Sequence, residues 1–233
     1  MDFHPDKCSI LRVHRKKDPL MYNYHLKGHT LASEQHTKYL GVIISQDLTW
    51  TNHVNSMVKK ANSVLGFLRR NLRISNEQTK VAAYKTLVRP HLEYCCTIWN
   101  PHTKELRNRV EMVQRRAARF TTRRYRNTSS VSEMLDHLNW ETLESRRIKS
   151  ALTLFYKVVN DLVDIPASTY LTPGSSRTRS AHSYKFRQFQ CSINSFKYSF
   201  FPSTVITWNS LPASIAEAPD LVSFKQGLSS LSF

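Results

Sequence analysis

The first 50 residues alternate short apolar runs with turn-forming residues, a pattern that is typical of β-strands. Three of these runs are rich in β-branched or aromatic residues and lie at residues 8–13, 20–26 and 29–32. Lys27 and Gly28 separate the second run from the third and predict a hairpin turn, because glycine adopts positive φ without steric cost. A fourth run, residues 39–44, is nearly all apolar and predicts a strand covered on both faces.

From residue 51 onward, apolar residues recur at steps of three and four, which predicts amphipathic helices. The first helix carries an apolar stripe of Val54, Val58, Ala61, Leu65 and Leu68. A second helix is predicted to begin at the sequence SNEQ, residues 75–78, which matches a capping box. Pro90 is expected to kink this helix, and Pro101 is expected to end the element that follows.

Further helices are predicted between residues 104 and 163. The one at residues 104–126 has a charged face opposite an inward stripe of Leu106, Val110, Val113 and Phe120. A short capped helix is expected over residues 130–140, and a long amphipathic helix is expected over residues 141–163.

The chain changes in character after residue 163. Residues 164–183 are rich in Pro, Ser and Thr and predict a mobile or extended link. Aromatic residues then alternate at positions 184 and 186 and at positions 196, 198 and 200, which predicts strands. Their rings would form a core or, alternatively, a stacking surface for bases. Residues 219–233 are expected to add a short helix through Val222, Phe224 and Leu228.

Together these elements predict an α+β fold with four parts. A small antiparallel β subdomain occupies residues 1–50, and a mainly α-helical region occupies residues 51–163. The link covers residues 164–183, and a short, mixed, aromatic-rich C-terminal extension covers residues 184–233. A sheet built only from these short strands would be marginally stable by itself.

The composition adds a strong positive charge to this fold. The chain has 34 Lys and Arg against 17 Asp and Glu, so its formal net charge is +17. The predicted helix at residues 104–126 alone has nine Lys or Arg and two Glu. Because arginine suits the geometry of phosphate and few acids neutralise this face, the pattern favours a nucleic-acid partner over a merely solvated basic surface.

Metal ligands and membrane segments are not expected. The cysteines at positions 8, 95, 96 and 191 have no CxxC spacing and no histidine at zinc-finger distance. His25 and His29 flank a predicted turn, which makes a shared ligand face improbable. We therefore expect reduced cysteines in an intracellular protein, in the nucleus or the cytoplasm. No run approaches the ~20 apolar residues that cross a bilayer, so no membrane partner is expected.

Six segments, in order along the chain, resemble the C-terminal half of reverse transcriptases from non-LTR, LINE-type retrotransposons, particularly jockey-like elements. They are FHPDKCSILRV (3–13), KYLGVIISQDLTWTNHV (38–54), YKTLVRPHLEYCCTIWNP (84–101), VEMVQRRAARF (110–120), LNWETLESRRIKSALTLFYKVVN (138–160) and TWNSLP (207–212). Each motif is modest alone, but the ordered series is specific and covers essentially the whole chain.

The resemblance implies roles for particular residues. PDKC looks like the late palm motif, which implies that Lys7 lies near the incoming nucleotide and supports proton transfer to, or neutralises, the leaving pyrophosphate. YLGV looks like the primer grip, a hairpin that holds the 3′ end of the growing strand. Its residues are Tyr39, Leu40, Gly41 and Val42. Residues 51–163 would then be the thumb, which tracks the template–primer duplex of RNA and DNA.

The metal-binding part of such a polymerase is missing from the chain. Polymerases of this family hold divalent metal ions with palm aspartates, usually an Asp-Asp pair, and this sequence has no such pair. Asp161 and Asp164 lie at the end of a predicted helix, which is the wrong context. We expect no cofactor in this chain and Mg²⁺ only in the full-length polymerase. Its fingers and metal-binding palm should precede Met1, which is expected to be an internal methionine of a longer reading frame.

The expected function is therefore binding of template–primer nucleic acid without polymerase activity. The alternative is a non-catalytic basic module for nucleic-acid binding or assembly, derived from such an element; an unrelated metalloenzyme has no ligand cluster to support it. The missing palm and fingers region is a further expected partner. Phosphate contacts are expected from Lys59, Lys60, Arg69, Arg70, Arg115, Arg116, Arg119, Arg123 and Arg124.

Overall fold

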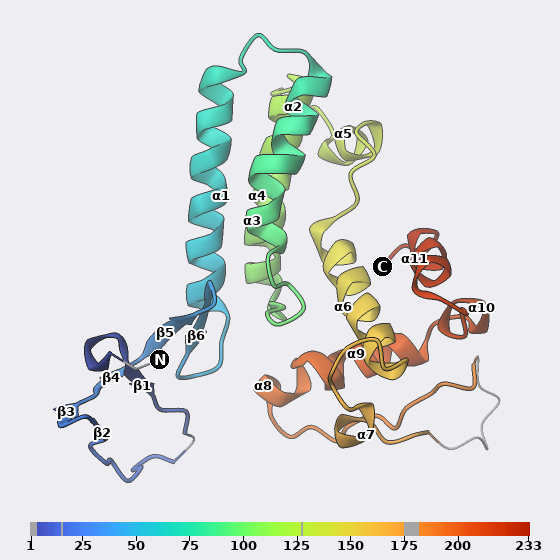
Figure 1. The fold of residues 1–233 in the computed structure, drawn as a ribbon. Helices are drawn as coiled ribbons and strands as arrows, with labels where there is room; N and C mark the ends of the chain where they lie inside the picture. Colours follow the sequence, from blue (N-terminus) through green and yellow to red (C-terminus); the bar gives the residue numbers. More distant parts are fainter. Residues whose placement is uncertain (1–3, 15, 127, 175–181) are drawn as a thin grey trace. The chain divides into compact units, whose positions relative to one another are not determined.

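The computed structural model describes residues 4–14, 16–126, 128–174 and 182–233 (Figure 1). The chain forms two compact units, Met1–Ser56 and Met57–Phe233, and each is described by itself. The fold is mixed α+β, as the sequence predicts, with short strands in the first unit and many helices in the second. Helix α1, Thr51–Asn71, begins in the first unit and continues into the second.

The short strands of the first unit pair two by two. They are β1 (Ser9–Leu11), β2 (His25–Leu26), β3 (His29–Thr30), β4 (Ala32–Glu34), β5 (His36–Tyr39) and β6 (Val42–Ser45). The pairs β2–β3 and β5–β6 are antiparallel hairpins, whereas β1 runs parallel to β4. The expected antiparallel subdomain is therefore wrong for β1 and β4. Their long connection allows a parallel pair, and it contains residues 20–24, which were expected to be strand.

Both hairpins turn at two residues with positive φ. Lys27 and Gly28 have φ of 51° and 79°, which confirms the predicted turn. Leu40 and Gly41 have φ of 45° and 88°, so the single strand predicted at residues 39–44 is wrong. The apolar run concealed this turn, and Leu40 is 74% exposed rather than covered.

Helix α1 begins at Thr51, a short turn after β6 ends at Ser45, and side chains from its first turn bind that strand. The Ile43 backbone N–H donates to His53 Nδ1 (3.2 Å), and Asn52 Nδ2 donates to Ser45 Oγ (3.2 Å). The predicted apolar stripe is confirmed. Val54, Ala61, Leu65 and Leu68 are buried, and Val58 is partly buried.

The next element is an irregular helix. It consists of α2 (Glu77–Ala83), a π-helical turn (Tyr84–Val88) and α3 (Arg89–Glu93). The N-cap is Asn76, whose Oδ1 accepts from the Thr79 N–H (2.8 Å), so the capping box predicted at residues 75–78 is wrong by one position. The wide turn lies just before Pro90, the residue expected to distort this helix.

Three further helices complete the middle of the chain: α4 (Lys104–Thr122), α5 (Val131–His137) and α6 (Leu143–Val159). The predicted inward stripe of α4 is buried. A buried polar chain joins three elements, because Tyr84 Oη donates to Gln114 Oε1 (2.8 Å) and Gln114 Nε2 donates to the Glu141 carbonyl (2.9 Å). The π-helical turn, α4 and the segment just before α6 are thereby joined.

The C-terminal region is mainly helical, and helices replace the strand predicted at residues 196–200, whereas Phe186 forms an isolated antiparallel bridge with Pro173. The region contains α7 (Ala167–Tyr170), α8 (Asn194–Lys197), α9 (Phe200–Asn209), α10 (Ala213–Ala216) and α11 (Leu221–Ser229). Two or three alternating aromatic positions are too few to separate a strand from a helix, which explains the error at residues 196–200. The final helix was predicted correctly. Residues 175–181 of the predicted link lie outside the described residues.

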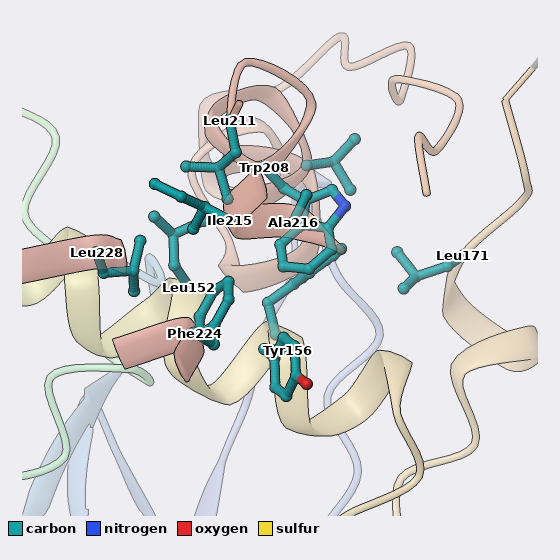
Figure 2. Close-up of a cluster of buried hydrophobic side chains, with 11 residues drawn as sticks. Leu152, Tyr156, Leu171, Trp208, Leu211, Ile215, Ala216, Phe224 and Leu228 are labelled. Atoms are coloured by element: carbon teal, nitrogen blue, oxygen red, sulfur yellow. The ribbon is translucent and has the colours of Figure 1, made fainter. Parts of the chain in front are cut away.

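This region shares a core with α6. Figure 2 shows Trp208 from α9 and Phe224 from α11 gathered near Tyr156 from α6. The rings of Tyr156 and Phe224 stack with their centroids 4.3 Å apart, and the ring centroids of Phe155 and Trp208 are 4.9 Å apart. Leu171, from the predicted link, is buried in the same cluster. Of the five aromatic residues predicted at strand spacing, Phe186 and Phe200 pack against this cluster, whereas Tyr184, Phe196 and Tyr198 are exposed.

Candidate nucleic-acid interface

The two halves of α4 differ in how their charges are compensated. In the N-terminal half, Arg109 Nη2 pairs with Glu105 Oε1 (2.8 Å) and Arg107 pairs with Glu144 of α6. The remaining acid of α4, Glu111, accepts the Glu144 backbone N–H (2.8 Å), and burial raises its pKa. The acids near α4 are thus used by its N-terminal half and by α6.

The C-terminal half of α4 keeps its positive charge. Arg115, Arg116, Arg123 and Arg124 are exposed, and Arg119 is partly buried. Residues three or four apart share a helix face, so Arg116, Arg119 and Arg123 form one row. The Arg-rich face predicted from the sequence is present.

Helix α1 contributes to the same surface. Arg116 Nη1 donates to Asn62 Oδ1 (3.2 Å), and the Arg69 guanidinium lies 6.0 Å from the centre of the Tyr125 ring. These contacts place α1 beside α4, as Figure 1 also shows. Lys59 precedes Asn62 by one helical turn and therefore shares its face.

The structure brings only some of the nine predicted cations together. Contacts and helix geometry put Lys59, Arg69, Arg116, Arg119 and Arg123 along the line where α1 meets α4. The other four are exposed but are not shown to join this line: Lys60, Arg70, Arg115 and Arg124. We call the nine residues together the α1–α4 basic face.

Carboxylates do not neutralise this face in the part of the chain that the structure describes. None of its nine cations lies within 4.0 Å of an Asp or Glu oxygen there, whereas Arg89, Arg107, Arg109 and Arg146 each have such a partner. Arg116 and Arg123 donate instead to neutral oxygens. Their charges therefore remain available to an anionic ligand.

Arg123 also explains why α4 ends earlier than predicted. It has φ of 57°, which ends the helix at Thr122 rather than at residue 126. Its Nη2 donates to the carbonyls of Arg73 (3.4 Å) and Ser75 (3.0 Å), which join the end of α4 to the loop after α1. These bonds hold a left-handed backbone that arginine rarely adopts.

The remaining predicted site residues lie in the first unit. Lys7 is exposed at the end of a 3₁₀ turn, Pro5–Lys7. Tyr39 and Leu40 are exposed at the tip of the β5–β6 hairpin, whereas Val42 is buried beneath it. The hairpin therefore presents an apolar tip that a ligand can contact.

Metal ligands do not cluster in the described ranges. No group of three or more His, Cys, Asp or Glu there could hold a metal ion, and all four cysteines are free. In the same ranges, no helix is both long enough and apolar enough to cross a membrane.

Sequence reasoning missed three residues at the tip of this interface. Arg73, Lys80 and Tyr125 line a hollow together with Arg69 and Arg123. A signal for Lys80 was present, because it precedes the buried Tyr84 by four residues and so lies on the inward stripe of its helix. A lysine at such a position is unusual.

Comparison with known proteins gives one weak relation. The chain is similar to the uncharacterized protein B0403.1 of Caenorhabditis elegans, with 24% identity over 152 residues. The match covers 65% of this chain and 76% of that protein. No family model and no solved structure matches the chain. The structure defines a mixed α+β protein with a basic face that lacks carboxylate partners among the described residues.

Proposed function

We propose that this chain is the C-terminal part of a non-LTR retrotransposon reverse transcriptase, and that it binds template–primer duplex without polymerising by itself. The observation that carries the proposal is the α1–α4 basic face, whose cations have no carboxylate partner among the described residues. Such a surface attracts a polyanion, and phosphate contacts give affinity that depends little on sequence. The ordered series of motifs supports the family assignment.

The two units contribute differently in this proposal. Helices α1 to α6 are the thumb, and α1 and α4 contact the duplex backbone. The β5–β6 hairpin is the primer grip, with exposed Tyr39 and Leu40 at its tip and Gly41 in the turn between strands. Lys7 is exposed and would act on the pyrophosphate only when the metal-binding palm is present.

Duplex binding tests the proposal directly. Fluorescence anisotropy with RNA–DNA hybrids of two unrelated sequences should give similar affinities that fall steeply with salt. Changing Arg115, Arg116 and Arg119 together to Gln should weaken binding to both. If the wild-type chain does not bind either hybrid at low salt, the proposed function is wrong.

Primer extension tests the second half of the proposal. On an RNA template with Mg²⁺ or Mn²⁺, the chain should add no nucleotide, because it lacks an Asp-Asp pair to hold the metal ions. Incorporation by this chain alone would contradict the statement that it lacks a polymerase site.

A second candidate is a basic module retained for nucleic-acid binding or assembly. Tyr94 and Ile98 favour it, because they are 54% and 59% exposed in the turn after α3 and offer an apolar protein contact. Both candidates bind duplex. The genomic DNA upstream of the Met1 codon separates them, since an in-frame palm with paired aspartates favours the polymerase and a promoter with a start site favours the module.

A further inference from the structure

A small hollow lies where the end of α4 meets the loop between α1 and α2. Its volume is ≈ 440 Å³, within the range of small-molecule sites in proteins. Four cations line it: Arg69, Arg73, Lys80 and Arg123. The rings of Phe120 and Tyr125 also line it, and no carboxylate does.

Lys80 is the least expected of these cations. Its side chain is 1% exposed, and its ammonium lies 4.9 Å from the centre of the Phe120 ring. In the described part of the chain, no carboxylate oxygen lies within ion-pair distance of it. Burial lowers the pKa of Lys80, the Arg123 guanidinium lowers it further, and Glu77 acts in the opposite direction. Glu77 itself contacts His137 Nε2 at 3.0 Å.

The arginines of the hollow are held by uncharged groups. Arg123 donates to the Arg73 and Ser75 carbonyls, and Arg69 lies over the Tyr125 ring. Neither kind of contact removes positive charge from the hollow. Four like charges around one small space repel one another, and an anion in that space would relieve the repulsion.

We propose that this hollow binds a phosphate group of a nucleic-acid strand, with Tyr125 as the surface on which the adjoining base stacks. The inference rests on the proposed duplex binding and adds a discrete site to it. Arginine forks and a lysine point charge both suit phosphate oxygens, and an exposed tyrosine next to an arginine suits a base. Either a strand-terminal phosphate or an internal phosphodiester supplies this chemistry.

Lys80→Met tests the pocket with the least damage to the fold. Methionine has a similar length and removes a buried charge, so the variant should remain folded. Arg73→Gln is a second variant, since the Arg73 backbone carbonyl that Arg123 uses is kept. Lys85→Met is the matched control, because it removes one exposed lysine that lies on the same irregular helix but outside the hollow.

The readout is anisotropy with one RNA–DNA hybrid that carries either a 5′-phosphate or a 5′-hydroxyl. Lys80→Met and Arg73→Gln should each weaken binding on the order of tenfold, as expected for one charge-assisted contact, and Lys85→Met should change it far less. A wild-type preference for the 5′-phosphate that Lys80→Met abolishes identifies a terminal phosphate. Equal wild-type affinities, lowered equally by Lys80→Met, identify an internal phosphodiester.

Two results separate failure of the pocket from failure of the proposed function. If the wild-type chain binds the hybrid and Lys80→Met behaves like Lys85→Met, the pocket is wrong and duplex binding stands. If the wild-type chain does not bind, inorganic phosphate tests the pocket alone. Phosphate should then raise the unfolding midpoint above that in chloride of equal ionic strength, and the absence of a rise, or the same rise in Lys80→Met, overturns the pocket.

Discussion

Two matched changes on α4 separate local phosphate contacts from the overall charge of the chain. One variant carries Arg115→Gln and Arg116→Gln, in the half of α4 that lacks carboxylate partners. The other carries Arg107→Gln and Arg109→Gln, in the half where both arginines pair with glutamates. Each variant lowers the formal net charge of +17 by two.

The expected difference is in the salt dependence of duplex binding. Each phosphate contact contributes about −0.9 to the slope of log K against log salt, so losing two contacts should flatten the slope by about 1.8. Over a fourfold rise in salt, the affinity deficit of the first variant should therefore shrink by about tenfold. The second variant should keep the wild-type slope, because its arginines are engaged by carboxylates and contact no phosphate.

The assay is anisotropy with one RNA–DNA hybrid over a series of salt concentrations. Urea unfolding of both variants serves as a control, since loss of the contact between Arg107 and Glu144 should lower stability slightly. Equal flattening by the two variants would refute the reasoning, because net charge rather than the position of the arginines would then govern binding. An unchanged slope in the first variant would show that this face points away from the duplex.

Three further changes test packing and protonation. Gly227→Ala places a Cβ 2.9 Å from Ile215 Cγ1, an overlap that costs roughly 1–3 kcal/mol and outweighs the gain in helix propensity, so the urea midpoint should fall. Gly66→Ala meets only a guanidinium nitrogen at 3.6 Å and should stabilise the chain by about 1 kcal/mol; a lower midpoint would contradict this. Burial lowers the pKa of His53, so the unfolded chain binds more protons, and stability should fall as pH drops below about 6.5. Hydrogen exchange at the Ile43 amide, which donates to His53, should accelerate over that range, and His53→Gln should remove the dependence.

Helix positions were predicted well because each long helix carries its own signal. The stripe in α1 and the stripe in α4 are periodic over several turns, and both are buried as expected. The strands were predicted less well because their signal is short. The apolar run at residues 39–44 hides the turn at Leu40 and Gly41, and the signals for a reversal were that glycine and the resemblance to a primer-grip hairpin. The paired direction of β1 and β4 depends on contacts between distant segments, which local pattern does not determine.

The sequence predicts that α4 has a basic face, but it does not predict which of the arginines pair with carboxylates. The sequence places Glu105 one turn before Arg109, so that pair was within reach of local reasoning. The partner of Arg107 is Glu144, which is 37 residues away and comes from α6. Which arginines of α4 are neutralised therefore depends on which helix packs against each half, and this is a property of the tertiary fold.

The helix itself helps to explain how such a face is tolerated without acids. The carbonyl end of an α-helix carries partial negative charge, and cations in the last turn interact favourably with it. Arg119 lies in the last turn of α4, and Arg123 is the first residue after the helix ends at Thr122. The acids, by contrast, lie toward the amino end, where Glu105 is in the first turn. The same polarity that stabilises α4 thus gathers its uncompensated charge at one end, next to Arg69 and the buried Lys80. A phosphate is better bound by such a concentrated end than by charge spread evenly along the helix, because contact strength falls with distance and with salt screening.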